Sequence, residues 1–315
     1  GVQTCALPIF ARLAVPFFYI TSSFLFFRKP NIDCDAVLHY VKRLSILFLF
    51  WFIFEIPFMY LKYFAYSENL LSTDILFFVR TTFLGNIYDG AYFIMALIVC
   101  VPLVYLLSIR FNNKVLLTIG ICLYLLSSAC DTYYSILPMK FREIADTINI
   151  VIGDISVSFI PCFIFVVVGK IIAEKSEECF SLNLFNLGII LCTLIILCFF
   201  ETAFNHNISN QPVGHTLRLH ISKVFAAISL FLFVLNIKAN WDLPYKSLRV
   251  YSTILFFSHV IFVQLTYLFN YHVVDLLHLN DTAQYFLVIV LSTITYFIMI
   301  WGSKTKLFSW MRFGY

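Results

Sequence analysis

Two ionisable side chains lie inside long apolar stretches of the sequence. Arg12 stands in RLAVPFFYITSSFLFF, and His259 stands in YSTILFFSHVIFVQL. A charge in such surroundings is costly to desolvate, so it needs a partner, a route to water or a function. An inward-facing Arg12 would bind a phosphate, a carboxylate or a developing oxyanion, and His259 would handle protons in catalysis. The alternatives are an Arg12 that extends to lipid headgroups and a His259 that is packed and hydrogen-bonded.

Two further pairs stand at the ends of apolar stretches. Lys42 and Arg43 precede LSILFLFWFIF, and we expect them to start the second helix. They are either membrane-surface anchors or a grip on the phosphates of an acyl carrier such as coenzyme A. Asp89 and Tyr92 open the stretch from residue 91, where an acid and an aromatic ring suit a sugar. Asp89 could equally serve only as a helix N-cap.

Other polar clusters carry less chemistry. Two predicted loops contain His and acidic residues at irregular spacings. We interpret these residues as solvated rather than as metal ligands. No metal site is expected, and the sequence contains no GxSxG, HExxH or P-loop motif. The loop residues are Glu201, His206, His215 and His220 in one loop and His272, Asp275, His278 and Asp281 in the other.

The elements that position these residues are predicted to be membrane helices. The chain has 315 residues, of which 61% are hydrophobic and only 12% charged, so lipid must solvate much of its surface. A spanning helix needs about 20 mostly apolar residues. Counting the apolar stretches of this length predicts an all-α bundle of about nine spanning helices. Asp154 and Pro161 predict that one of them is kinked or lines a cavity. Residues 74–86 are too short to span and are expected either to lie along the interface or to form a re-entrant piece. The predicted spans are 8–27, 44–64, 91–109, 114–130, 150–173, 184–204, 220–237, 250–269 and 283–302.

The charges between the stretches predict the orientation. If the loop at 28–43 is cytoplasmic and the helices alternate, fourteen Lys and Arg residues fall inside and six outside. The net charge of +4 is too mild to indicate a nucleic-acid partner. The start GVQTCALPI has no initiator Met and no charged n-region. We expect residues 1–9 to be non-native and residues 10–315 to form one membrane domain. The expected domain has ten helices, and the first of these is missing from this sequence.

Five segments together resemble the membrane acyltransferase 3 family. RLAVPFFYITSSFLFF is similar to its second-helix signature, although Ser22-Ser23 replaces the usual Ser-Gly. KRLSILFLFWFIF resembles its basic entry to the third helix, and GAYFIMALIVCVPLVYLL its "WFL-x-ALI" helix, with Tyr92 in the aromatic pair. PCFIFVVVGKIIAEK resembles its "PFFLLGYLLA" helix. YSTILFFSHVIFVQL resembles its "S-x-x-x-Y-L-I-H" helix, with His259 on the His.

The resemblance implies a ten-helix enzyme of the bacterial inner membrane. It would transfer an acyl group, commonly acetyl from acetyl-CoA, to a hydroxyl of a surface glycan or glycolipid. The family's catalytic His lies in its first helix, so the general base is not assigned to a residue of this chain. Arg12 and His259 are the expected catalytic residues, and Lys42, Arg43, Asp89 and Tyr92 the expected substrate contacts. The rival hypotheses are a transporter or glycan flippase, which inverted repeats and paired broken helices would favour, and a structural or sensory membrane protein.

Overall fold

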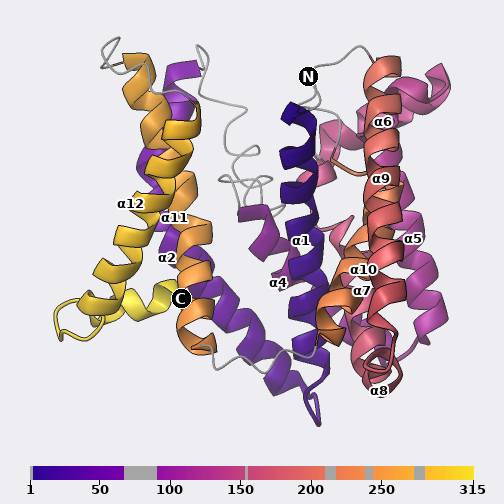
Figure 1. Cartoon of the computed structure of the whole chain (residues 1–315), viewed down its shortest axis with the longest axis horizontal. Helices are drawn as coiled ribbons and strands as arrows, with labels where there is room; N and C mark the ends of the chain where they lie inside the picture. The colour runs from indigo at the N-terminus through magenta and orange to yellow at the C-terminus, as the bar shows by residue number, and fades with distance from the viewer. Residues whose placement is uncertain (1–2, 67–90, 153–154, 210–217, 238–243, 273–280) are drawn as a thin grey trace. The chain divides into compact units, whose positions relative to one another are not determined.

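The computed structural model describes residues 3–66, 91–152, 155–209, 218–237, 244–272 and 281–315 (Figure 1). Among these residues every regular element is helical, which confirms the all-α prediction. Side chains are described for a smaller set, which begins at Leu13. The described chain divides into two compact units. Unit 1 contains residues 1–39 and 92–239, and most of unit 2 comes from residues 40–75 and 240–315.

Unit 1 is built around helix α7 (Cys162–Glu174). This helix packs between α1 (Gln3–Phe27) and α5 (Asn113–Cys130). About 78% of the segment that contains α7 is buried, against 22% for the equally apolar α9 (Leu184–Ser209). A helix that is apolar on all sides is stable only where other apolar groups surround it. Protein therefore surrounds α7, whereas lipid must cover the exposed face of α9.

The remaining elements of unit 1 close this core. Helix α10 (Ile221–Asn236) packs on α1 and α9. Helix α4 (Ala91–Ser108) contacts α1 through Phe93, whose ring stacks on Tyr19 with centroids 5.1 Å apart. The short elements are the 3-10 helices η1 (Tyr134–Ile136) and η2 (Ile155–Val157), and the helices α6 (Met139–Ile152) and α8 (Ser176–Cys179).

Unit 2 combines α2 (Cys34–Tyr66), α11 (Tyr245–His272), α12 (Asp281–Gly302) and η3 (Ser309–Gly314). Residues 34–39 of α2 group with unit 1. Trp51 on α2 stacks on Phe257 of α11, with centroids 5.3 Å apart, and its indole N–H donates to the Gly314 carbonyl at 3.0 Å. One tryptophan therefore joins α2 both to α11 and to the end of the chain.

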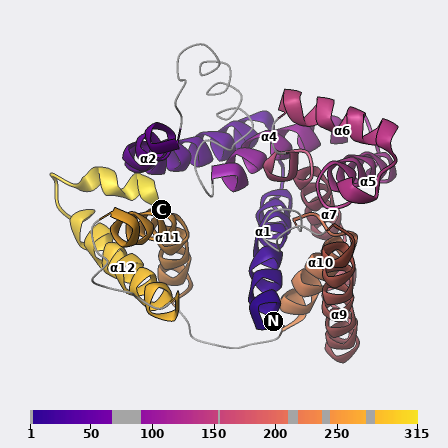
Figure 2. The same cartoon turned by 90° about the horizontal axis from the view of Figure 1, so that it is seen from above.

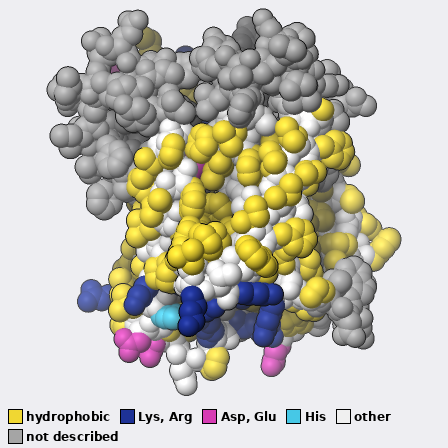
Figure 3. All heavy atoms as spheres, turned by 90° about the vertical axis from the view of Figure 1, so that its left-hand side faces the viewer, with side chains coloured by type: hydrophobic (Ala, Val, Ile, Leu, Met, Phe, Trp, Pro, Cys, Tyr) yellow, Lys and Arg dark blue, Asp and Glu magenta, His cyan; other side chains and the backbone are white. Residues whose placement is uncertain are grey.

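An apolar band covers the side on which α12 lies. Figure 3 shows hydrophobic side chains across this face, with Lys and Arg gathered along one edge. Phe297 and Trp301 are among the exposed apolar residues of α12. The start of α11 and the end of α12 carry exposed cations at Lys246 and Lys304. An apolar band with a basic edge is the pattern of a multi-pass membrane protein.

Within the described residues, six helices are long and apolar enough to cross a membrane. Three shorter apolar helices cover 13–27, 92–108 and 221–236. The predicted segment 150–173 is not one helix: α6 ends at Ile152, η2 follows, and α7 begins at Cys162 after Pro161. The predicted break is therefore confirmed near Pro161, whereas Asp154 and residues 74–86 lie outside the described residues.

The start of one helix was predicted wrongly, and another helix was missed. Helix α2 begins at Cys34, so Lys42 and Arg43 lie in its third turn rather than at its start. Asp33 caps this earlier start by accepting from the Ala36 amide at 2.8 Å. The second error is α6, which lies in a stretch that the prediction treated as a loop because its apolar residues are too few to span.

Candidate functional site

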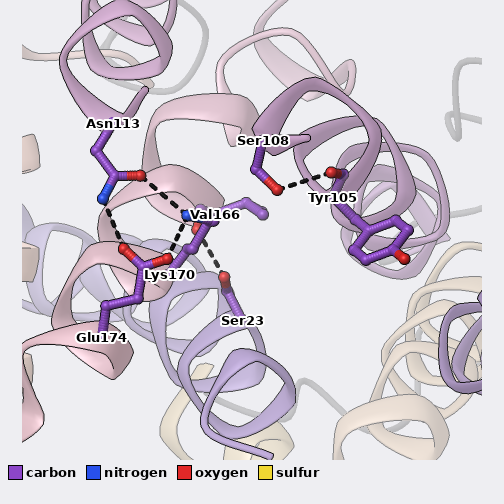
Figure 4. Close-up of polar contacts among 7 residues, drawn as sticks. All are labelled: Ser23, Tyr105, Ser108, Asn113, Val166, Lys170 and Glu174. Atoms are coloured by element: carbon purple, nitrogen blue, oxygen red, sulfur yellow. Dashed lines mark hydrogen bonds and ion pairs between the residues drawn. The ribbon is translucent and has the colours of Figure 1, made fainter. Parts of the chain in front are cut away.

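A buried cation joins α5 to α7 near one end of unit 1. Lys170 on α7 is 7% exposed, and its ammonium lies 2.9 Å from Asn113 Oδ1 and 2.5 Å from Glu174 Oε1. Asn113 closes the triangle by donating from Nδ2 to Glu174 Oε2 at 2.6 Å (Figure 4). Each of the three groups therefore has a complementary partner, which is the condition for burying a charge.

The same end of α7 lies unusually close to α1. Ser23 on α1 donates its hydroxyl to the Val166 carbonyl on α7 at 2.6 Å (Figure 4). Gly169 allows this approach, because a Cβ at that position would lie 2.6 Å from the Ile20 carbonyl oxygen. Two segments that carry the family resemblance, RLAVPFFYITSSFLFF and PCFIFVVVGKIIAEK, are thus in direct contact.

Further cations surround this end of unit 1, which we call the basic end. The Arg28 guanidinium, just after α1, lies over the rings of Phe24 and Phe180 at 5.5 and 5.2 Å. Lys114 follows Asn113 on α5, and Lys175 comes directly after Glu174, the last residue of α7. Lys170 and Lys175 pair with Glu174 and Glu178. Arg28 and Lys114 are therefore the cations that the basic end offers to an anionic ligand.

A half-buried carboxylate organises the opposite end of unit 1, which we call the far end. Glu201 on α9 accepts from the backbone N–H groups of Ile221 and Ser222 at 2.9 and 3.0 Å, and also from the hydroxyls of Ser222 and Tyr133. These amides belong to the first turn of α10, so Glu201 caps that helix from a neighbouring one. Burial and the hydrogen bond to Glu201 raise the pKa of Tyr133 well above its usual value.

More polar side chains lie next to this cap. His220 is buried, and its Nε2 lies 3.3 Å from Thr202 Oγ1. Its carbonyl accepts from the Tyr124 hydroxyl at 2.8 Å. Lys223, 4% exposed, donates to the Arg218 carbonyl. These contacts connect α5, α9 and α10, and every one of them satisfies a backbone or side-chain group of the protein itself.

Of the six predicted site residues, two lie outside what the structure describes. Asp89 falls in a segment outside the described residues, and the side chain of Arg12 on α1 is likewise not described. The structure describes the side chains of the four other predicted residues. Tyr92 is half-buried at the start of α4, and Lys42 and Arg43 are exposed on α2.

His259 on α11 is half-buried, and its Nδ1 lies 3.1 Å from the Leu255 carbonyl one turn earlier. The Phe256 ring lies beside it, with centroids 5.9 Å apart. Tyr92 belongs to unit 1, whereas Lys42, Arg43 and His259 belong to unit 2. The four described residues therefore do not form one cluster within either unit.

The sequence analysis missed the buried charges Lys170 and Lys223, and also Glu55 on α2, which is 1% exposed. It placed Glu201, His206 and His220 in one solvated loop, whereas Glu201 and His206 lie in α9 and His220 is buried at the start of α10. It also placed His272 and Asp281 in a loop, whereas they lie in α11 and α12. The signal was present, because Glu55 and Lys170 interrupt apolar runs just as Arg12 and His259 do. Among the described residues, no group of three or more His, Cys, Asp or Glu is placed to hold a metal ion.

Comparisons of the chain with known protein families, with curated proteins and with solved structures find no match. The geometry of these polar groups and the apolar surface around them therefore carry the functional argument.

Proposed function

We propose that this protein is an O-acyltransferase of the bacterial inner membrane. It would carry an acyl group, most simply acetyl, from acyl-CoA to a hydroxyl of a surface glycan or glycolipid. The proposal includes nine spanning helices in this chain and a tenth before them. It rests on the ordered resemblance of five segments to the membrane acyltransferase 3 family and on the polar groups held inside an apolar bundle.

The observation that carries the proposal is the basic end of unit 1. Lys170 is buried there with Asn113 and Glu174, and Arg28, Lys114 and Lys175 lie around it. The phosphates of coenzyme A are anions, and cations at the cytoplasmic face of a bilayer attract such a donor. Two of the segments that carry the resemblance meet at this end, through the hydrogen bond from Ser23 to Val166.

The reaction itself is an exchange of one acyl bond for another. The acceptor hydroxyl attacks the thioester carbonyl, so that a C–O bond forms and the C–S bond breaks. The hydroxyl proton passes to a general base, and the leaving thiolate of coenzyme A takes up a proton. Such proton transfer is typically worth about 10² to 10⁴ in rate. Arg12 would stabilise the developing oxyanion, and His259 would position the substrate.

Lys42 and Arg43 provide a direct test of donor binding. Membranes that contain the protein are given acetyl-CoA with a labelled acetyl group, and label in the glycan fraction is counted. We expect Lys42→Gln with Arg43→Gln to raise the KM for acetyl-CoA at least tenfold, because each lost phosphate contact costs on the order of 1–2 kcal/mol. The matched control is Lys304→Gln with Lys306→Gln, which removes two other exposed cations and leaves KM unchanged.

The rival hypothesis of a glycan flippase predicts a different result. A flippase moves glycan across the bilayer without acyl-CoA and leaves no label in it. Absence of transfer from every acyl-CoA tested, together with glycan movement, would replace the acyltransferase proposal with this one.

A further inference from the structure

The protein core covers only part of the apolar face of helix α6. The helix spans Met139–Ile152 between η1 and η2, at the far end of unit 1. Ala145 is buried, and it packs with Ile148 and Ile152 against Cys130 and Ile155. The Tyr134 hydroxyl also donates to Asp146 Oδ1 at 2.8 Å, which fixes the helix to η1. Helix α6 is therefore firmly attached to unit 1 along one side.

A second row of apolar side chains lies beside this attached side. Phe141, Ile144 and Val151 are 58%, 55% and 68% exposed. At 100° per residue, Ile144 and Val151 lie within about 20° of one another. Phe141 lies about 60° further round, toward the buried Ala145. Lys140 and Thr147 border the row on its other side, so the exposed apolar row lies between the core contact and the polar face.

The direction of α6 differs from that of the membrane-spanning helices. In Figure 2, which views the molecule from above, α6 lies lengthwise while α5 is seen nearly end-on. Helix α5 is one of the helices long and apolar enough to cross the membrane. If α5 crosses the bilayer, α6 lies along its surface. The exposed Leu125 and Leu126 of α5 carry the lipid-facing surface toward this end.

The charges of α6 argue for one mode of contact with the bilayer. Lys140 and Arg142 balance Glu143 and Asp146, so the helix has no net charge to attract acidic headgroups. The guanidinium of Arg142 is moreover committed to the backbone carbonyls of Leu137 and Ser135. Apolar burial is the contact that remains, and amphipathic helices at membrane surfaces bury their apolar face in this way.

We propose that α6 is an interfacial helix that inserts Phe141, Ile144 and Val151 into the lipid at the far surface of the membrane. The helix thereby sets the depth at which the far end of unit 1 sits, including the polar contacts around Glu201. This proposal is independent of the acyltransferase reaction, since it depends only on lipid as the partner.

Spin labels on single cysteines would test this placement in proteoliposomes of neutral phospholipid. Labels replace Ile144 and Val151, and matched control labels replace Glu143 and Thr147 on the polar face, in a chain whose exposed Cys34, Cys122 and Cys192 are changed to serine. We expect the labels at 144 and 151 to be several-fold more accessible to oxygen than to a water-soluble nickel reagent. The labels at 143 and 147 should show the opposite preference.

Three results would overturn the proposal. Equal access of the nickel reagent to all four labels would place α6 in water. Immobile labels at 144 and 151 that neither reagent reaches would show that protein covers the row. A lipid contact that disappears when salt is added would show electrostatic attachment in place of insertion.

Discussion

Ser23 on α1 donates a hydrogen bond of 2.6 Å to the backbone carbonyl of Val166 on α7. The bond is fully buried and joins residues 143 positions apart. In lipid, close approach of two helices depends on small residues and on polar contacts of this kind, because apolar side chains gain little by leaving a solvent of hydrocarbon. Ser23 and Gly169 together therefore hold the central pair of helices in unit 1.

Gly169→Ala should destabilise unit 1. The new Cβ would lie 2.6 Å from the Ile20 carbonyl oxygen and 2.8 Å from Ser23 Cβ. Backbone cannot move aside cheaply, so α1 and α7 must separate, and we expect a loss of about 1–3 kcal/mol. Thermal unfolding in detergent measures the effect.

Gly188→Ala is the matched control for that substitution. Gly188 is also a helical glycine in unit 1, on α9, but its new Cβ would meet only Phe233, at 3.5 Å. Alanine favours a helix over glycine by about 1 kcal/mol, so we expect the melting temperature of this variant to hold or to rise. A similar loss in both variants would contradict the close-contact explanation.

Glu174→Leu should cost more stability than Lys170→Met, although the two changes break the same ion pair. The Lys170 ammonium is buried and would keep only Asn113, whereas the Glu174 side chain is 44% exposed and can turn to water. An uncompensated buried group costs about 1–3 kcal/mol, and a solvated one far less. Unfolding of both variants and of the double variant gives the comparison.

The exposed pair Lys175 and Glu178, 3.5 Å apart, is the control for the buried one. We expect Lys175→Met to change stability by less than about 0.5 kcal/mol. If this substitution cost as much as Glu174→Leu, burial would not explain the difference between the two pairs.

Tyr133→Phe should destabilise the far end of unit 1 by about 1 kcal/mol at neutral pH, because the hydrogen bond to Glu201 is lost. Burial and that bond raise the pKa of Tyr133 in the folded protein. Its contribution to stability is therefore complete below the unfolded pKa of about 10 and is lost as the pH rises toward the folded value. The difference in stability between the two proteins should shrink from pH 8 to pH 11, as chemical unfolding at each pH would measure. A difference that is constant across this range would show that Tyr133 does not titrate in the way the geometry implies.

The apolar runs made the helical class predictable, because runs of about 20 residues have few alternatives. The boundaries of the helices were harder to predict from the sequence. Helix α2 starts at Cys34 because Asp33 caps it there, and this capping signal was hidden by the basic residues that follow. Helix α6 was missed because a helix that lies across the bundle needs only a stripe of apolar residues.

The candidate site depended on contacts that sequence does not encode locally. The position of Lys170 in an apolar run marks it as unusual, but its partner Asn113 comes from another helix. Glu201 lies inside the predicted span 184–204, but its role as a cap was not visible in the sequence because the amides that it caps belong to α10, twenty residues later. Of the residues with a predicted role, His259 contacts the Leu255 carbonyl within its own helix, and Lys42 is exposed.

Cys34 should report the side of the membrane on which α2 begins. It is exposed next to the basic connector that contains Arg28 and Lys29, and positively charged connectors remain in the cytoplasm. We expect a membrane-impermeant maleimide to leave Cys34 unlabelled in intact cells and to label it after the cells are permeabilised. The exposed Cys122 and Cys192 lie within helices that are long and apolar enough to cross the membrane, and they should stay unlabelled in both cases. The control is Glu143→Cys in a Cys34→Ser chain, which places the thiol on the polar face of α6 and should be labelled in intact cells. The reverse pattern would invert the topology and move the basic end, with Lys170, away from cytoplasmic acyl-CoA, so this one measurement bears on both the orientation and the proposed reaction.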